Sequence, residues 1–440
     1  MGYLGIGYSG VKIFCGLMDL CVPACRSTYN TIIKKIRNAA SAIATVSMNT
    51  AVREEIECSE NKNSLVVSGD GSWRKRACQS LHGIASLIGN YTGKVLDVVV
   101  KSSYCAACKI WEHRCGTSEY LEWLNIHEEE CNANHEGNAG KMEADAIIEM
   151  FESSESKYDV KYKYYIGDGD SKTFKTILTK KPYGAEFEIY KRECVGHVQK
   201  RMGTRLRSIK KEKKLGGVGK LTDNLIGELT KYYGKAIRAN SDSVEKMKNS
   251  IWATYYHKCS TDDHPQHEFC PVGPESWCSW RKAEAEGKLE TYIHKPAIRC
   301  NVQREIFPIY EALSDDTLLQ RCLGGYSQNA NECFNNKVWK IAPKTSFSGT
   351  ETIEIAAFLA TAVFNDGCHA LLALFEKLNI SYGNRTVVAC QEEDNRRLHD
   401  SDISVQRRSK QSRIKKIRDL QKKADEDIGP ESCFYLPGNF

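Results

Sequence analysis

The spacing of hydrophobic residues along the chain changes from helical to strand-like near residue 60. Before that point, apolar positions such as Ile32, Ile36 and Ile43 recur at helical spacing, which predicts helices with one buried face. Beyond it, short β-branched runs predict three strands, at residues 65–70, 83–88 and 94–101. The turn-forming residues at 89–93 join the last two strands into a predicted hairpin.

Helices and strands alternate in the next part of the chain. We predict a helix at 141–154, a strand starting at 161, a helix near 171–180 and a strand at 187–190. The order β-β-β-α-β-α-β predicts an α/β fold, a mixed sheet flanked by helices. After residue 194 the pattern becomes mainly helical, at 221–240, 243–257 and 306–323.

These patterns divide the chain into five parts. We expect an N-terminal helical segment (1–60), a first part of the sheet core (61–198) with a Cys/His-rich insertion (104–140), a helical insertion (199–322) with a second Cys/His cluster (259–278), a final part of the core (323–390) and a basic, partly disordered tail (391–440). The most apolar window, 353–375, is interrupted at Asn365-Asp366-Gly367 into pieces too short to cross a bilayer. We therefore expect no membrane partner.

Composition narrows the class only slightly. The chain has 440 residues, enough for a large core, and its net charge of +6 is too weak to identify a nucleic-acid partner by itself. The 19 cysteines are odd in number and cluster with histidines, and the first residues do not resemble a secretory signal. We therefore expect a reducing, intracellular compartment in which cysteines are thiols or metal ligands.

Two stretches share one design, an apolar run that leads into Gly-Asp-Gly. They are 64–73 (SLVVSGDGSW) with Asp70 and 161–171 (KYKYYIGDGDS) with Asp168. If the two strands are neighbours in one sheet, their carboxylates lie side by side and could bind hard cations such as Mg²⁺. The alternative is that each Gly-Asp-Gly is only a turn. Their repetition, together with Glu332 in a predicted helix among several asparagines, favours the metal site.

Two groups of cysteines and histidines have the spacing of zinc ligands. In the first, Cys105, Cys108, His127 and Cys131 form a CxxC followed by an HxxxC, which is typical of a closed Zn²⁺ site. His113, Cys115 or His135 could replace one ligand, and a redox CxxC or unliganded thiols are the alternatives. In the second, we expect His267, Cys270 and Cys278, completed by Cys259 or His264. Both sites would be structural, since four protein ligands leave no position for substrate.

Basic residues gather in two segments. The first follows Cys194, and its candidate DNA contacts are Lys200, Arg201, Arg205, Lys210 and Lys211. The second is the run 407–423, for which nuclear import is as good an explanation as DNA contact. A solvated helix face is the alternative for the first segment. The glycines at 216–219 lack the spacing of a phosphate loop, so we exclude a nucleoside-triphosphate site.

Taken together, these motifs resemble those of Mutator-like transposases of the animal type. The matching motifs are Ser68-Gly-Asp-Gly-Ser-Trp73, Cys105-X-X-Cys108, Met142-Glu143, Ile166-Gly-Asp-Gly-Asp-Ser171, Cys194-X-X-His197, His267-X-X-Cys270-Pro, Ser276-Trp-Cys278 and Gln328-Asn-X-Asn-Glu332. They follow the family's order over residues 60 to 345.

The resemblance implies an RNase H-like core with a DDE triad of Asp70, Asp168 and Glu332, which would bind two Mg²⁺ or Mn²⁺ ions. It implies DNA cleavage and strand transfer at transposon ends, with DNA as partner, homo-oligomeric assembly and a nuclear location. Cys194 and His197 would support the active site, although such a pair could serve packing alone. Asp170 is the rival of Asp168, but it suits a helix cap better.

Two other classes of function remain open at this point. One is a domesticated or inactive descendant that only binds DNA or protein. The other is a two-carboxylate hydrolase that acts on sugars without metal.

Overall fold

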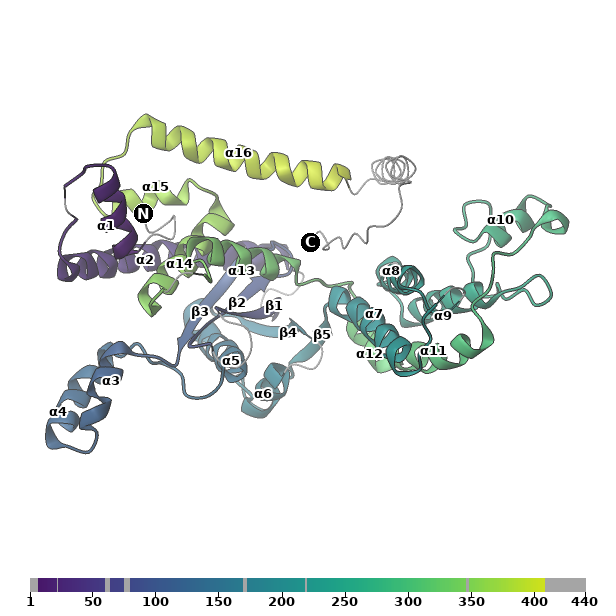
Figure 1. Cartoon of the computed structure of the whole chain (residues 1–440), viewed down its shortest axis with the longest axis horizontal. Helices are drawn as coiled ribbons and strands as arrows, with labels where there is room; N and C mark the ends of the chain where they lie inside the picture. The colour runs from purple at the N-terminus through teal and green to yellow at the C-terminus, as the bar shows by residue number, and fades with distance from the viewer. Residues whose placement is uncertain are drawn as a thin grey trace. The chain divides into compact units, whose positions relative to one another are not determined.

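The computed structural model describes residues 7–21, 23–59, 64–74, 80–168, 172–217, 220–345 and 348–407. The chain separates into two compact units, residues 1–365 and 366–440. The first unit contains a five-stranded mixed sheet and most of the helices (Figure 1). The expected α/β class is therefore confirmed.

The sheet consists of β1 (Ser64–Trp73), β2 (His82–Gly89), β3 (Val95–Ser102), β4 (Lys161–Gly167) and β5 (Tyr190–Glu193). Its order is β3-β2-β1-β4-β5. β1, β2 and β3 pair in antiparallel fashion, as the predicted hairpin requires, whereas β4 lies parallel to both β1 and β5. The two Gly-Asp-Gly strands, β1 and β4, are thus neighbours at the centre of the sheet.

The two faces of the sheet carry different residues of β1. Leu65 and Val67 point to the face covered by α5 (Ala139–Tyr158), where Phe151 and the fully buried Tyr162 and Tyr165 complete the core. α6 (Lys172–Lys180) packs beside α5 on this side. The alternate residues Ser68 and Asp70 point to the other face, which is covered by α13 (Asn329–Ile341) (Figure 1).

The end of the sheet differs from the sequence prediction. We expected a strand at 187–190, but β5 begins at Tyr190 and ends at Glu193. Phe187 lies outside the strand, and its ring packs edge-on against Tyr183 at 5.2 Å. The aromatic residue Phe187, on which the predicted strand start depended, packs against Tyr183 and takes no part in strand pairing.

Further helices of the first unit pack near the sheet or extend from it. α1 (Tyr8–Leu17) and α2 (Arg26–Cys58) form the expected N-terminal helical segment. The buried carboxylate of Glu55 in α2 accepts hydrogen bonds from the backbone N–H groups of Tyr91 and Thr92, which fixes the β2–β3 turn. α3 (Ala106–Trp111) and α4 (Ser118–His127) form the Cys/His-rich insertion, and α14 (Thr350–Asp366) follows α13.

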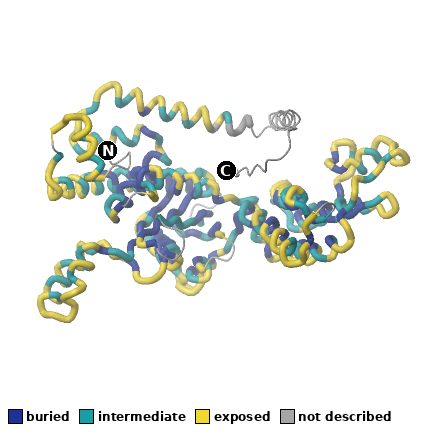
Figure 2. The backbone as a smooth tube through the Cα atoms, in the orientation of Figure 1, coloured by how far each residue is buried: buried dark blue, intermediate teal, exposed yellow. Residues whose placement is uncertain are grey.

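A second hydrophobic core lies within the helical insertion. α7 (Val195–Glu212), α8 (Asp223–Ala239), α9 (Val244–Cys259), α11 (Cys300–Leu313) and α12 (Asp316–Cys322) enclose it, and α10 (Ser279–Ala285) lies in the loop region between α9 and α11. Figure 2 shows buried segments both in the sheet and in this helical group. Tyr233 and Tyr310 are fully buried here, and the Tyr233 hydroxyl donates to the carbonyl of Leu313 at 2.8 Å.

The second unit contains α15 (Ala370–Lys377) and α16 (Asn384–Arg407). Within it, the Asp394 carboxylate accepts from the Cys368 N–H at 2.7 Å and contacts His369 Nδ1 at 3.0 Å. Residues 391–407, the first part of the expected basic, partly disordered tail, continue α16 as a helix. Most of the predicted basic run, from residue 408 onward, lies outside the described residues. Among the described helices, none combines the length and apolarity that crossing a membrane requires.

Candidate active site and Cys/His clusters

The parallel pairing of β1 and β4 runs toward Asp70 and Asp168. Its last pair is Ser68 with Ile166, and Asp70 and Asp168 each lie two residues further along the chain. β4 ends at Gly167, and Asp168 follows directly, as the sequence predicted. β1, in contrast, continues to Trp73, so Asp70 lies inside a strand opposite Ser86 and not at a turn.

α13 brings the third acid to these two aspartates. Asn331 of this helix is fully buried and contacts both sides of Ser68, accepting from its hydroxyl at 2.7 Å and donating to its carbonyl at 3.1 Å. One turn later, Asn335 Nδ2 donates to Asp70 Oδ2 at 2.8 Å. Glu332 lies between these two anchors, so the helix presents its carboxylate near the end of the central strands.

Two basic side chains of α7, His197 and Lys200, contact the acids. His197 Nδ1 lies 3.4 Å from Asp168 Oδ1, and its Nε2 lies 3.9 Å from Glu332 Oε1. Lys200, one turn further along α7, places Nζ 3.6 Å from the same Glu332 oxygen. One imidazole therefore bridges the second and third acids of the proposed triad. Hydrogen bonding to Asp168 raises the pKa of His197 above its usual value.

The local field around Asp70 favours a cation. Burial, and after it the nearby charge of Glu143, raises the pKa of Asp70 to about 7. Burial likewise raises the pKa of Glu143, and Asp168 adds to this rise. Crowded, partly buried carboxylates hold protons because they repel one another, and a bound cation removes that repulsion. The oxygen-rich donor set of Asp70, Asp168 and Glu332 thus fits a hard divalent ion.

Glu143 is a carboxylate to which sequence analysis gave no role. It lies on α5, beyond Gly71, and it accepts a hydrogen bond from the Thr173 hydroxyl at 3.1 Å. A Cβ on Gly71 would come within 2.8 Å of Glu143 Cγ, so glycine at this position lets the carboxylate approach β1. The sequence contains both Gly71, the second glycine of SGDGSW, and the Met142-Glu143 motif. No spacing rule connects them, so the sequence alone did not predict that Glu143 approaches Gly71.

The remaining predicted residues near the site have different surroundings. Cys194 is buried, and its sulfur accepts the Gln328 N–H at 3.3 Å, so it contacts the loop before α13 rather than the carboxylates. Of the basic residues, Arg201 forms an ion pair with the fully buried Glu193 at 2.8 Å, and Lys210 pairs with Asp223 at 2.9 Å. The side chains of Lys200, Arg205 and Lys211 are exposed on α7.

The first Cys/His cluster assembles in the Cys/His-rich insertion. Cys105, Cys108, His127 and Cys131 each offer a ligand atom, and these atoms all lie within 4.8 Å of one another. Cys105 Sγ is 3.3 Å from His127 Nε2, and Cys108 Sγ is 3.5 Å from Cys131 Sγ. The alternative ligands of the sequence analysis, His113, Cys115 and His135, do not join this group. A set of three sulfurs and one imidazole nitrogen fits Zn²⁺.

The second Cys/His cluster has an unexpected member. His257 joins His267, Cys270 and Cys278, with all four ligand atoms within 4.8 Å. Both histidines present Nδ1 to the Cys278 sulfur, each at 3.5 Å. We expected Cys259 or His264 to complete the set. Since residues two apart on a helix face different directions, α9 turns His257 toward the cluster and Cys259 into the helical core. His264 is exposed.

His267 also has an ordered outer contact. Its Nε2 lies 3.0 Å from both Ser260 Oγ and His294 Nε2, and His294 Nδ1 contacts Asp262 Oδ1 at 2.7 Å. Such outer hydrogen bonds fix the tautomer and the orientation of a histidine that binds metal through its other nitrogen. The donor set of two nitrogens and two sulfurs fits Zn²⁺ as well.

The fold is a mixed α/β sheet with flanking helices, in which Asp70 lies in β1, Asp168 directly follows the parallel strand β4, and His197 contacts both Asp168 and Glu332. Among the described residues, these three carboxylates are not one of the groups whose ligand atoms all lie within 4.8 Å of one another. A model of the Mutator-like transposase family matches residues 1–278, which is more than half of the 440 residues. The chain belongs to the Mutator-like transposase family. The match includes Asp70, Asp168 and both Cys/His clusters, whereas Glu332 lies beyond it. No curated protein and no solved structure matches the chain. Membership implies, in general terms, DNA cleavage and strand transfer with divalent metal ions.

Proposed function

We propose that this chain is a DDE transposase that cleaves DNA at the ends of a Mutator-like element and joins the freed 3′ ends to target DNA. The observation that supports the proposal is the parallel pairing of β1 and β4 up to Ser68 and Ile166, two residues before Asp70 and Asp168, together with the contacts of His197 to Asp168 and Glu332. The sheet order β3-β2-β1-β4-β5 supports an RNase H-like core. A nuclear location and a homo-oligomeric assembly belong to the same proposal.

In this mechanism the residues of the chain hold and orient the reacting groups. Asp70 and Asp168 would bind the divalent ions from the sheet, and Glu332 would complete the shell from α13. When bound, these ions supply a metal-activated water or 3′ hydroxyl and stabilise the leaving oxygen. His197 keeps Asp168 and Glu332 oriented toward one another, and Asn335 does the same for Asp70. Exposed Lys200, Arg205 and Lys211 would contact DNA phosphates.

We also propose that both Cys/His clusters bind structural Zn²⁺. Cys105, Cys108, His127 and Cys131 would hold one ion. His257, His267, Cys270 and Cys278 would hold the other. Each set supplies four protein ligands, which leaves no position for substrate and excludes a catalytic role for the ion.

The test of the proposed function is Mg²⁺-dependent cleavage of duplexes that carry the element's ends. Asp168→Asn should abolish cleavage and leave DNA binding within about twofold of wild type, because the amide keeps the shape but loses the charge that binds metal. Glu152→Gln, an exposed acid on α5, is the matched control and should cleave normally. Cleavage by Asp168→Asn at the wild-type rate would sink the assignment.

A further inference from the structure

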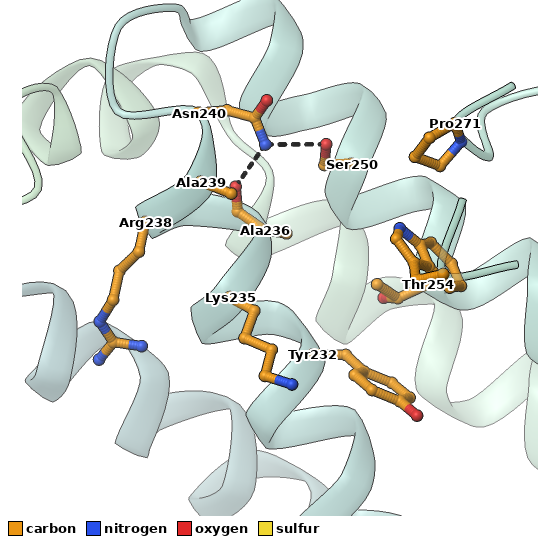
Figure 3. Close-up of a pocket in the computed structure, with 10 residues that line it drawn as sticks. Tyr232, Lys235, Ala236, Arg238, Ala239, Asn240, Ser250, Thr254 and Pro271 are labelled. Atoms are coloured by element: carbon orange, nitrogen blue, oxygen red, sulfur yellow. Dashed lines mark hydrogen bonds between the residues drawn. The ribbon is translucent and has the colours of Figure 1, made fainter. Parts of the chain in front are cut away.

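A pocket of about 690 Å³ opens in the helical insertion, away from the carboxylates. Its lining comes from three segments: α8, α9 and the loop that carries the second Cys/His cluster. Figure 3 shows Tyr232 and Lys235 of α8 on one side of the space, with Thr254 of α9 and Pro271 of the loop across from them. The volume lies within the range of small-molecule sites and suffices for one nucleotide.

Two aromatic rings form the walls of this pocket. Trp277 is about half exposed, at 50%, and its ring lies nearly parallel to that of Tyr232, with centroids 6.4 Å apart and planes 25° apart. The Tyr232 hydroxyl donates to Glu228 at 2.9 Å, and Lys258 also binds this carboxylate at 2.9 Å. Tyr232 is thus held in place, whereas Trp277 presents an open face.

The second Cys/His cluster fixes the wall that carries Trp277. Pro271 directly follows Cys270, and Trp277 directly precedes Cys278. The Trp277 ring also packs edge-on against His257, another member of the cluster, at 5.0 Å. The side of the pocket formed by the loop is therefore held by cluster residues.

Positive charge is available at the same pocket. Lys235 and Arg238 lie three residues apart on α8, and both line the pocket. Neither side chain forms an ion pair with a described residue. Lys235 Nζ lies 5.9 Å from the centre of the Tyr232 ring, and Arg238 extends toward α7, where it donates to the neutral Gln199 at 2.7 Å. Two cations without paired acids, next to aromatic walls, match a ligand with an anionic and a flat aromatic part.

We propose that this pocket binds an unpaired nucleotide of the DNA substrate, with its base against Trp277 and Tyr232 and its phosphate near Lys235 and Arg238. Stacking on aromatic side chains tolerates every base, because each base has a flat face. The proposal rests on the proposed function, since it makes DNA the occupant.

Contacts along α7 connect this pocket to the acidic site. Arg238 at the pocket bonds to Gln199, and the adjacent residue, Lys200, reaches Glu332 at 3.6 Å. Helix α7 therefore contacts the acidic site through Lys200 and contacts α8, which lines the pocket, through Gln199. A DNA strand processed at the acids could extend an unpaired nucleotide along α7 into the pocket.

The test compares two labelled duplexes, one fully paired and one with a single unpaired 2-aminopurine nucleotide, in buffer without divalent metal ions. The zinc-loaded full chain should bind the unpaired form about tenfold more tightly and quench its fluorescence, because the base stacks on an aromatic ring. Trp277→Ala should remove both the preference and the quenching, and Trp277→Phe should restore part of each. Trp111→Ala, in the Cys/His-rich insertion, is the matched control and should behave as wild type.

A second arm tests the charge. Changing both Lys235 and Arg238 to Gln should weaken binding of the unpaired form. It should also reduce the slope of log affinity against log salt by roughly 0.7 for each phosphate that the protein no longer neutralises. Thermal melting of each variant shows whether it is folded.

The outcomes separate this proposal from the proposed function. If Trp277→Ala keeps the preference for the unpaired duplex, or if wild type shows no preference, the pocket proposal is overturned while cleavage by the acids still stands. If Trp277→Ala changes only self-association or protein binding, the pocket binds a protein partner, and the proposal that it binds a nucleotide is overturned. Failure of wild type to bind either duplex would overturn both proposals.

Discussion

The sheet core and the helical insertion are built on different principles. In the sheet, backbone pairing positions the candidate site, because β1 and β4 pair in parallel up to Ser68 and Ile166, and Asp70 and Asp168 each follow two residues later. In the helical insertion, no ladder fixes the pocket or the second Cys/His cluster, which depend on how α8, α9 and one loop pack. The first region offers carboxylate oxygens as candidate ligands, and the second offers sulfur and nitrogen atoms. Their sites should therefore fail separately.

The largest expected effect concerns the second Cys/His cluster in the helical insertion. His257→Ala should reduce the zinc content of the purified chain from two ions to one, because a structural site of this kind needs all four ligands. Cys259→Ala is the matched control, and it should keep both ions, since Cys259 faces the helical core. Elemental analysis measures the result, and the opposite pattern would restore the ligand set expected from the sequence.

The next effect concerns the joint between the two regions. Glu193 at the end of β5 is fully buried and contacts Arg201, Lys191 and Arg321 at 2.8, 3.6 and 3.7 Å. Glu193→Gln should lower the free energy of unfolding by about 4 kcal/mol, because it leaves the buried Lys191 ammonium without its counter-charge, whereas Arg201 and Arg321 are partly exposed. Chemical denaturation measures this, with exposed Glu188→Gln as control. A change below about 1 kcal/mol would show that the cations reach water.

A smaller effect concerns the sheet alone, and it is a dependence of the free energy of unfolding on pH. His82 in β2 is only 2% exposed, and neither ring nitrogen has a hydrogen-bond partner among the described residues. Burial, and after it the charge of Arg74, lowers the pKa of His82 to about 4, against about 6.5 in an unfolded chain. As pH falls, the imidazole of His82 therefore takes up its second proton at a higher pH in the unfolded chain than in the folded chain.

Stability from His82 is present above pH 6.5 and is lost as pH falls toward 4. We expect a loss of about 3 kcal/mol over that window, and His82→Gln should remove this part of the pH dependence. Denaturation at several pH values tests it. Identical pH profiles for wild type and variant would contradict the assignment.

The smallest effect compares the stability changes of two glycine substitutions, one in the sheet core and one in the helical insertion. Gly71→Ala in β1 should cost about 1 kcal/mol, since the new Cβ meets Glu143. Gly227→Ala in α8 has nothing within 4 Å and should add about 1 kcal/mol, because alanine favours a helix interior. Thermal melting of the two variants tests both signs, and a destabilising Gly227→Ala would reveal a contact at that helix face.

The sequence predicted the sheet better than the helical insertion, for a physical reason. Strands alternate side chains every two residues, so the SGDGSW and YIGDGD runs revealed both the strands and the acids they carry. One prediction was wrong locally, because β5 begins three residues later than predicted. Residues 169–171, including Asp170, lie outside the described part of the chain.

Spacing rules also explain which ligands were found. The first Cys/His cluster follows a local pattern, and the same four residues assemble in the structure. The second takes His257 from a helix whose facing depends on its tertiary packing, so the sequence offered Cys259 instead. Glu143 and the pocket between Tyr232 and Trp277 likewise arise from contacts between segments distant in sequence, which no periodicity encodes.

The most direct test of the central claim is a Mn²⁺ titration of the zinc-loaded chain, followed by the electron paramagnetic resonance signal of free Mn²⁺. If Asp70 and Asp168 share one cation site, Asp168→Asn should weaken Mn²⁺ binding at least tenfold, because the site loses one of its charged oxygen ligands. Asp170→Asn, two residues away, should bind Mn²⁺ as wild type does. Unchanged affinity in Asp168→Asn, or a larger loss in Asp170→Asn, would contradict the account.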